Sequence, residues 1–118
     1  MIRKLVQQFR IWYVQNQAEQ IAIPEFKPDR ICRYRIRFSG RVQNVGFRME
    51  AAQIAHKLGL TGFCENLSDG DVLAEFQGQE NKIIFLIAFM ESLKRIVIEH
   101  KVMNEIPVIA GSAGFDCR

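Results

Sequence analysis

One arginine and one asparagine stand in settings where they could act on a phosphate. Arg48 ends a loop that contains Gly40 and Gly46, and Asn66 stands just before the turn-forming residues 68–70. An arginine can bind a phosphate through two parallel hydrogen bonds and a full charge. An asparagine amide can orient a water molecule by accepting one hydrogen bond and donating another. Together these residue types could bind a phosphoryl group and direct water at it.

The loop before Arg48 joins an alternating apolar segment to a helical one. The first N–H groups of a helix have no partner within the helix, and the helix dipole adds positive charge there. A loop that turns its amides inward at this point therefore forms an anion site. The candidate phosphate-binding residues are Gln43, Asn44, Val45, Gly46, Phe47 and Arg48. Spacing alone leaves open an ordinary connecting loop with a solvated arginine, and for Asn66 a plain turn residue.

The elements that must position these residues follow from the apolar periodicity. Alternating residues predict strands, and apolar residues three and four apart predict helices. Gly59 stands where a helix cap is expected, and residues 68–70 are typical of a hairpin turn. The predicted elements are a strand over 33–38, a helix over 47–58, strands over 61–67 and 71–77, a helix over 80–95, a strand over 96–102 and a short final strand over 114–118.

This order predicts an α+β protein with the ferredoxin-like split βαβ plan, βαββαβ plus the short C-terminal strand. The sheet is then rich in antiparallel pairs, and both helices pack on one of its faces. The loop after the first strand and the end of the second strand emerge at the same edge. With one strand between them they lie about 10 Å apart, a gap that an arginine side chain can largely cover. The topology thus brings Arg48 and Asn66 together.

Two motifs resemble the acylphosphatase family. Residues 40–48 read Gly-Arg-Val-Gln-Asn-Val-Gly-Phe-Arg, and residues 58–63 read Leu-Gly-Leu-Thr-Gly-Phe, followed by Asn66-Leu67 and Asp69-Gly70. The resemblance runs from Tyr34 to the C-terminus. It implies hydrolysis of the carboxyl–phosphate bond of a small acyl phosphate, without metal or cofactor. It also implies that Arg48 and the loop amides bind phosphate while Asn66 orients the attacking water.

The loop departs from the family pattern at Asn44, where the family usually has glycine. If that position needs positive φ, asparagine tolerates it better than most residues, though at some energetic cost. Its side chain would also narrow the phosphate entrance. The alternative function is therefore a catalytically weakened phosphate-binding or protein-interaction module with the same fold.

The first 32 residues fall outside this resemblance, so we predict two parts, 1–32 and 33–118. Residues 1–19 have the apolar spacing of an amphipathic helix, and a connector with two prolines follows. The helix over 80–95 has more large apolar residues than one stripe can bury, including Phe85 and Phe89. We expect the N-terminal helix to cover this surplus or to mediate a homodimer. A membrane-surface role is the other interpretation of its basic, tryptophan-containing character.

The composition excludes several other classes of protein. The chain has 118 residues, 48% of them apolar and 25% charged, so it suits one globular domain. No apolar run approaches the length of a membrane span. The well-separated Cys32, Cys64 and Cys117 indicate reduced thiols in the cytoplasm. His56 and His100 lack the neighbours of a metal site, so no metal is expected.

Nucleic-acid binding is the remaining rival, because ferredoxin-like sheets also bind RNA. A row of Arg33, Arg35 and Arg37 is expected on the solvent face of the sheet. Residues 71–76 carry two acids and lack the aromatic pattern of RNA-binding sheets, and the net charge is only +3. No nucleic-acid partner is therefore expected.

Overall fold

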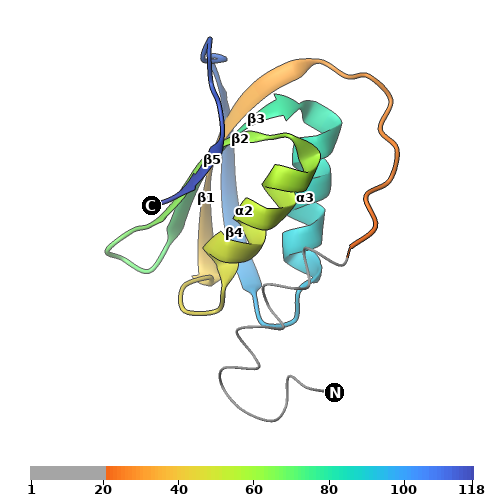
Figure 1. Ribbon diagram of the computed structural model, residues 1–118. Coiled ribbons are helices and arrows are strands. Elements are labelled where there is room, and N and C mark those ends of the chain that lie inside the picture. Colours follow the sequence, from red (N-terminus) through yellow and green to blue (C-terminus); the bar gives the residue numbers. More distant parts are fainter. Residues whose placement is uncertain (1–20) are drawn as a thin grey trace.

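The computed structural model describes residues 21–118, so the predicted helix over 1–19 lies outside the described residues. Two helices cover one face of a sheet, as Figure 1 shows. The elements are β1 (Ile31–Arg41), α2 (Phe47–Leu58), β2 (Thr61–Asn66), β3 (Val72–Gln79), α3 (Glu80–Ser92), β4 (Val97–Ile106) and β5 (Phe115–Cys117). The predicted order of elements is confirmed, including the short final strand.

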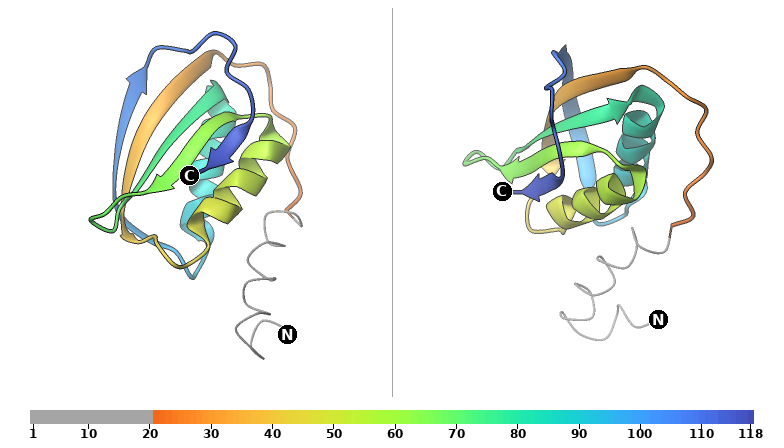
Figure 2. Two further views of the ribbon diagram at one scale, coloured as in Figure 1. Left: turned by 60° about the vertical axis from the view of Figure 1, so that its left-hand side comes forward. Right: turned by 45° about the horizontal axis from the view of Figure 1, so that its top comes forward.

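The sheet has the strand order β4-β1-β3-β2-β5. The pairs β1–β3, β1–β4 and β2–β3 are antiparallel, and β2–β5 is parallel. Figure 2 shows this sheet from a second side, with β4 and β5 at its two edges. Because β1 and β2 are both antiparallel to β3, which lies between them, they run parallel to each other. Both strands therefore finish at the same end of the sheet, which is the arrangement that the sequence predicts.

Element bounds differ from the prediction where long-range pairing takes over from local pattern. β1 begins at Ile31, which pairs with Gln79 of β3. β4 runs to Ile106, which lies opposite Arg33 of β1. α3 ends at Ser92 and not at residue 95, because Leu93 is already extended with φ −79° and ψ 126°. None of the helices within residues 21–118 has the length and apolar character needed to cross a bilayer.

The core lies between the two helices and the sheet. α2 turns one apolar stripe inward, and Gly59, with φ 71°, ends the helix by donating its N–H to the preceding turn. That glycine is the predicted cap. The largest side chains that are fully buried are Phe38, Phe47, Phe76, Ile36, Ile54, Ile83, Leu86 and Met90.

The connector before β1 packs against α3. Phe26 meets Phe85 edge to face, with the ring centroids 5.5 Å apart. Ile21 and Ile23 also contact the core, and the main-chain oxygen of Ile21 accepts a hydrogen bond from Lys57 at 3.2 Å. Part of the apolar surplus predicted on α3 is therefore covered by the connector.

The face of the sheet opposite the helices is only partly open to solvent. Arg35 and Arg37 are exposed, as predicted, with 55% and 45% of their side-chain surface accessible. Arg33 is only 4% exposed, so the prediction that its side chain faces solvent is wrong. Its Nε donates to Glu75 at 2.8 Å, and its Nη1 lies 3.4 Å from the hydroxyl of Ser112, which belongs to the loop between β4 and β5. That loop covers the ion pair, which local periodicity could not indicate.

Candidate active site

Buried apolar residues anchor the loop between β1 and α2 at both ends. Val42 is 1% exposed and Phe47 is 2% exposed. The ring of Phe47 lies 4.9 Å from that of Phe38 in β1, measured between centroids. Near the end of β1, a Cβ on Gly40 would lie 2.2 Å from the main-chain oxygen of Val97, so only glycine fits where β1 pairs with β4 at this point.

Two residues of this loop have left-handed backbone. Gly46 precedes α2 with φ 80° and ψ 16°, and Asn44 has φ 62°. Asn44 is the one non-glycine residue with positive φ within residues 21–118. Left-handed residues in a short loop can turn successive N–H groups toward one side, which is how backbone nests bind anions. Position 44 therefore has the positive φ that glycine favours, as considered above for the departure from the family pattern.

Arg48 lies in the first turn of α2 and is held by the last residues of the chain. Its side chain is half-buried. Nη1 donates to the main-chain oxygen of Arg118 at 2.5 Å, and the main-chain oxygen of Arg48 accepts a hydrogen bond from the thiol of Cys117 at 3.3 Å. The β5 segment, far away in the sequence, thus fixes both the backbone and the guanidinium of Arg48.

Asn66 is the last residue of β2, opposite Val72 in the register, and it is exposed. The loop reaches this strand end through Gln43. Its Nε2 donates to the main-chain oxygen of Leu67 at 2.8 Å and to that of Asp71 at 2.9 Å. The loop and the β2–β3 turn accordingly lie at the same end of the sheet, as Figure 1 also shows.

Arg37 stabilises the β2–β3 turn through two ion pairs. Arg37 in β1 donates to Asp71 at 2.7 Å and also pairs with Asp69. The N–H of Asp71 donates to the Asp69 carboxylate at 3.0 Å and, with Arg37 nearby, lowers the pKa of that carboxyl. Because these contacts hold the turn, the main chain around Asn66 is fixed from both sides.

Cys64 lies in β2 directly beside Cys117 in β5. Burial raises the pKa of the Cys64 thiol well above its usual value and also raises the pKa of Cys117. Both thiols therefore stay protonated near neutral pH, and the thiolate form that acts as a nucleophile is disfavoured. Among residues 21–118, no group of three or more histidine, cysteine or acidic side chains is arranged to hold a metal ion.

Sequence reasoning missed the residues that position the candidates. The contact of Arg48 with Arg118 spans 70 residues and that of Gln43 with Asp71 spans 28. Gln43 was expected to contribute through the loop main chain, whereas its side chain makes the link to the next turn. No local pattern marks such pairs, although the βαββαβ order already indicates which ends of strands meet.

The fold and the loop define a class: a ferredoxin-like α+β sandwich whose first strand-to-helix loop contains two left-handed residues. A family model described as Acylphosphatase matches residues 34–116. The acylphosphatase of Clostridium beijerinckii is 39% identical over 90 residues, which is 73% of this chain and 97% of that protein. That of Rubrobacter xylanophilus is 36% identical over 87 residues, 73% of this chain and 79% of its own length.

Solved structures agree with these relatives. The crystal structure of acylphosphatase from Bacillus subtilis superimposes with a TM-score of 0.69 at 28% identity and covers 75% of this chain and 99% of its own. An acylphosphatase structure from Coxiella burnetii gives a TM-score of 0.67 at 29% identity and covers 75% of this chain and 93% of its own. The chain therefore belongs to the acylphosphatase family of enzymes.

Proposed function

We propose that this protein hydrolyses the carboxyl–phosphate bond of small acyl phosphates, releasing a carboxylate and inorganic phosphate. Family membership supports this activity. The observation that carries the assignment to residues is the link through Gln43, which joins the loop before Arg48 to the turn that follows Asn66. A phosphate-binding group and a water-binding group can therefore share one end of the sheet.

Arg48 and the loop amides bind the phosphoryl group in this proposal. The guanidinium carries five N–H donors in a planar fork, and two parallel donors suffice for two phosphate oxygens. The start of α2 adds unpaired amides and the positive end of the helix dipole. Charge on the phosphoryl oxygens is stabilised in the transition state by this fixed set of donors.

Asn66 positions the attacking water. Its carbonyl oxygen accepts a hydrogen bond from the water, and its NH₂ group donates to another oxygen. An amide is no base, so a phosphate oxygen of the substrate takes the proton. The water oxygen bonds to phosphorus as the carboxylate departs, and this leaving group needs no general acid because its conjugate acid has a pKa of about 4.

Asn44 supports the second candidate, a weakened phosphate-binding module without turnover. Asparagine has a side chain at the entrance where the family usually has glycine, and its backbone is left-handed.

The cytoplasmic location is supported by three free thiols, Cys32, Cys64 and Cys117. A homodimer formed through residues 1–19 stays a prediction.

Hydrolysis of benzoyl phosphate, measured with and without a chelator, tests the proposal. We expect turnover that the chelator does not change. Asn66→Ala should lower kcat about 10²–10³-fold, as loss of one fixed polar group at a reacting centre typically does, with inorganic phosphate still inhibiting at the same concentration. Phosphate binding without any turnover by the unaltered protein would favour the weakened module instead.

A further inference from the structure

We propose that Gln43 is a positioning residue, which holds Asn66 at the correct place relative to the phosphate loop. This inference rests on the proposed function, since it names the group that sets the geometry of the same site. Its basis is one carboxamide that makes two hydrogen bonds across the neck of the β2–β3 turn.

The two acceptors of Gln43 are the oxygens that close this turn. The main-chain oxygen of Asp71 also accepts the N–H of Leu67 at 2.8 Å, and the main-chain oxygen of Leu67 also accepts the N–H of Gly70 at 3.2 Å. Each oxygen therefore has one partner inside the turn and a second partner, Nε2 of Gln43, from the loop. The part-buried NH₂ group of Gln43 therefore donates both of its hydrogens to main-chain oxygens of the turn.

Both ends of this link are next to a candidate site residue. Gln43 directly precedes the left-handed Asn44 of the loop, and Leu67 directly follows Asn66. A shift of the turn relative to the loop therefore moves the Asn66 side chain relative to the bound phosphoryl group. Misplacement by about 1 Å can reduce the rate of a positioned reaction about a hundredfold.

Other contacts keep the turn folded without Gln43. Arg37 donates to Asp71 from β1, and Asn66 pairs with Val72 in the β2–β3 ladder. Loss of the Gln43 donors should thus leave the fold in place and free the turn to move against the loop. The effect expected is on catalysis more than on folding.

Gln43→Met tests the inference, because methionine has a similar length and no N–H donor. We expect kcat on benzoyl phosphate to fall about ten- to a hundredfold, while the inhibition constant of inorganic phosphate stays unchanged. Gln53→Met in α2 is the matched control and should keep wild-type kcat. If Gln43→Met does not fold, Gln43→Asn serves, since its shorter amide cannot reach both oxygens.

The same substitution in an Asn66→Ala background separates positioning from a merely structural role. If Gln43 acts through Asn66, the double variant has the kcat of Asn66→Ala alone. Losses that multiply would overturn the inference, and so would wild-type kcat in Gln43→Met beside a large loss in Asn66→Ala. Wild-type kcat in Asn66→Ala would instead overturn the proposed function itself, and the role of Gln43 with it.

Discussion

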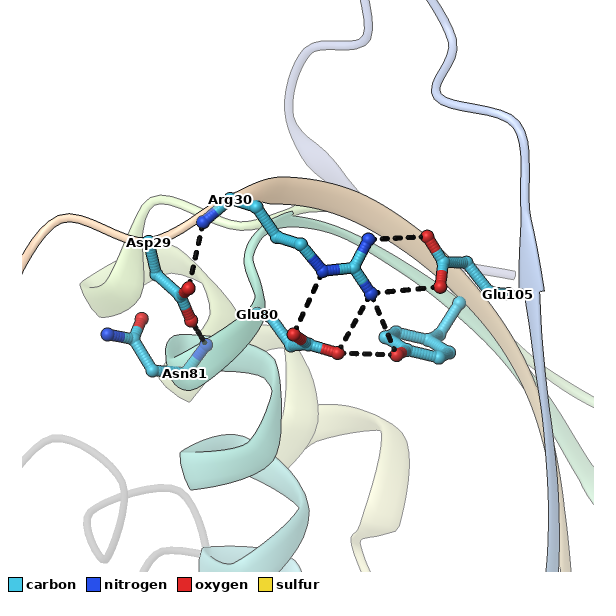
Figure 3. Close-up of polar contacts among 6 residues, drawn as sticks. Asp29, Arg30, Glu80, Asn81 and Glu105 are labelled. Atoms are coloured by element: carbon cyan, nitrogen blue, oxygen red, sulfur yellow. Dashed lines mark hydrogen bonds and ion pairs between the residues drawn. The ribbon is translucent and has the colours of Figure 1, made fainter.

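The two helices begin at opposite ends of the sandwich, and their first turns are completed in different ways (Figure 1). At the start of α3 the chain supplies its own anions. The carboxylate of Asp29 accepts the N–H of Asn81 at 2.9 Å, and Arg30 lies between the carboxylates of Glu80 and Glu105 (Figure 3). This end is closed by internal charge pairs.

The start of α2 has no such closure. Its N-cap residue, Gly46, has no side chain that could cap the helix. Glu50 lies in the first turn, but it is fully buried and pairs with Arg95 at 2.9 Å. Arg48 donates to one main-chain oxygen, that of Arg118, whereas Arg30 donates to the side-chain carboxylates of Glu80 and Glu105. One helix start is therefore closed by ion pairs between side chains, whereas the cation at the other, Arg48, has a main-chain oxygen as its partner. In the proposed function, this arginine binds the phosphoryl group.

The largest effect that can sharpen this contrast is on turnover. Arg48→Ala should lower kcat on benzoyl phosphate about 10³–10⁵-fold and weaken inhibition by inorganic phosphate, because it removes the charged donor to the transferred group. Arg30→Ala is the matched control at the other helix start. It should keep wild-type kcat and lose thermal stability. Equal losses of kcat in Arg48→Ala and Arg30→Ala would contradict the assignment of phosphate binding to the start of α2 alone.

A smaller effect is expected at the closed helix start. Asp29→Ala removes the acceptor for the N–H of Asn81, so the free energy of unfolding should fall by about 0.5–2 kcal/mol, as for loss of a helix cap. Urea unfolding measures this change. Inhibition by inorganic phosphate should not move, and a weakened inhibition would mean that this end also takes part in anion binding.

Asn44→Gly tests how the asparagine side chain affects the loop before α2. Glycine relieves a left-handed backbone that costs ordinary residues about 1–2 kcal/mol, but it also adds about 0.5–1 kcal/mol of conformational entropy to the unfolded chain. The unfolding free energy should therefore rise by between about 0 and 1.5 kcal/mol. With the entrance wider, kcat/KM on benzoyl phosphate should rise. A fall in kcat/KM would show that the Asn44 side chain assists the reaction.

Acid titration should give the smallest effect. Hydrogen bonds from Arg30 lower the pKa of Glu80 and that of Glu105 below the ordinary value of 4.5. A lowered pKa in the folded state contributes stability above the unfolded pKa, and this contribution is lost as pH falls below about 4.5. Arg30→Met should flatten that part of the stability curve, measured by urea unfolding from pH 6 to pH 3. An unchanged slope would contradict the role of Arg30.

The order of the elements and the position of the candidate residues could be predicted from the sequence, because both follow from local pattern. Alternation before Gly40, the apolar stripe of α2 and the turn after Asn66 were sufficient to predict the order of elements along the chain. They also indicated that Arg48 and Asn66 lie at the same end of the sheet. The family motifs then indicated the residues. The register of β1 against β4 and the end of α3 at Ser92 were not predictable, since they depend on pairing across the sheet.

The polar links could not be predicted for the same reason. Arg30 and Glu105 are 75 residues apart, and Arg33 lies beneath a loop 79 residues away at Ser112. Periodicity reports which face of an element is apolar, but it does not identify the partner of a charged side chain. The burial of Arg33 and the cap supplied by Asp29 therefore appear only in the folded chain.

A titration of the assigned ¹⁵N-labelled protein with inorganic phosphate tests the central claim most directly. We expect saturable shifts of the amide resonances of residues 44–48 and of the Asn66 side chain, with those of residues 80–82 unmoved, and no shifts in Arg48→Ala. Shifts centred on the start of α3, or an unaltered titration in Arg48→Ala, would contradict the account.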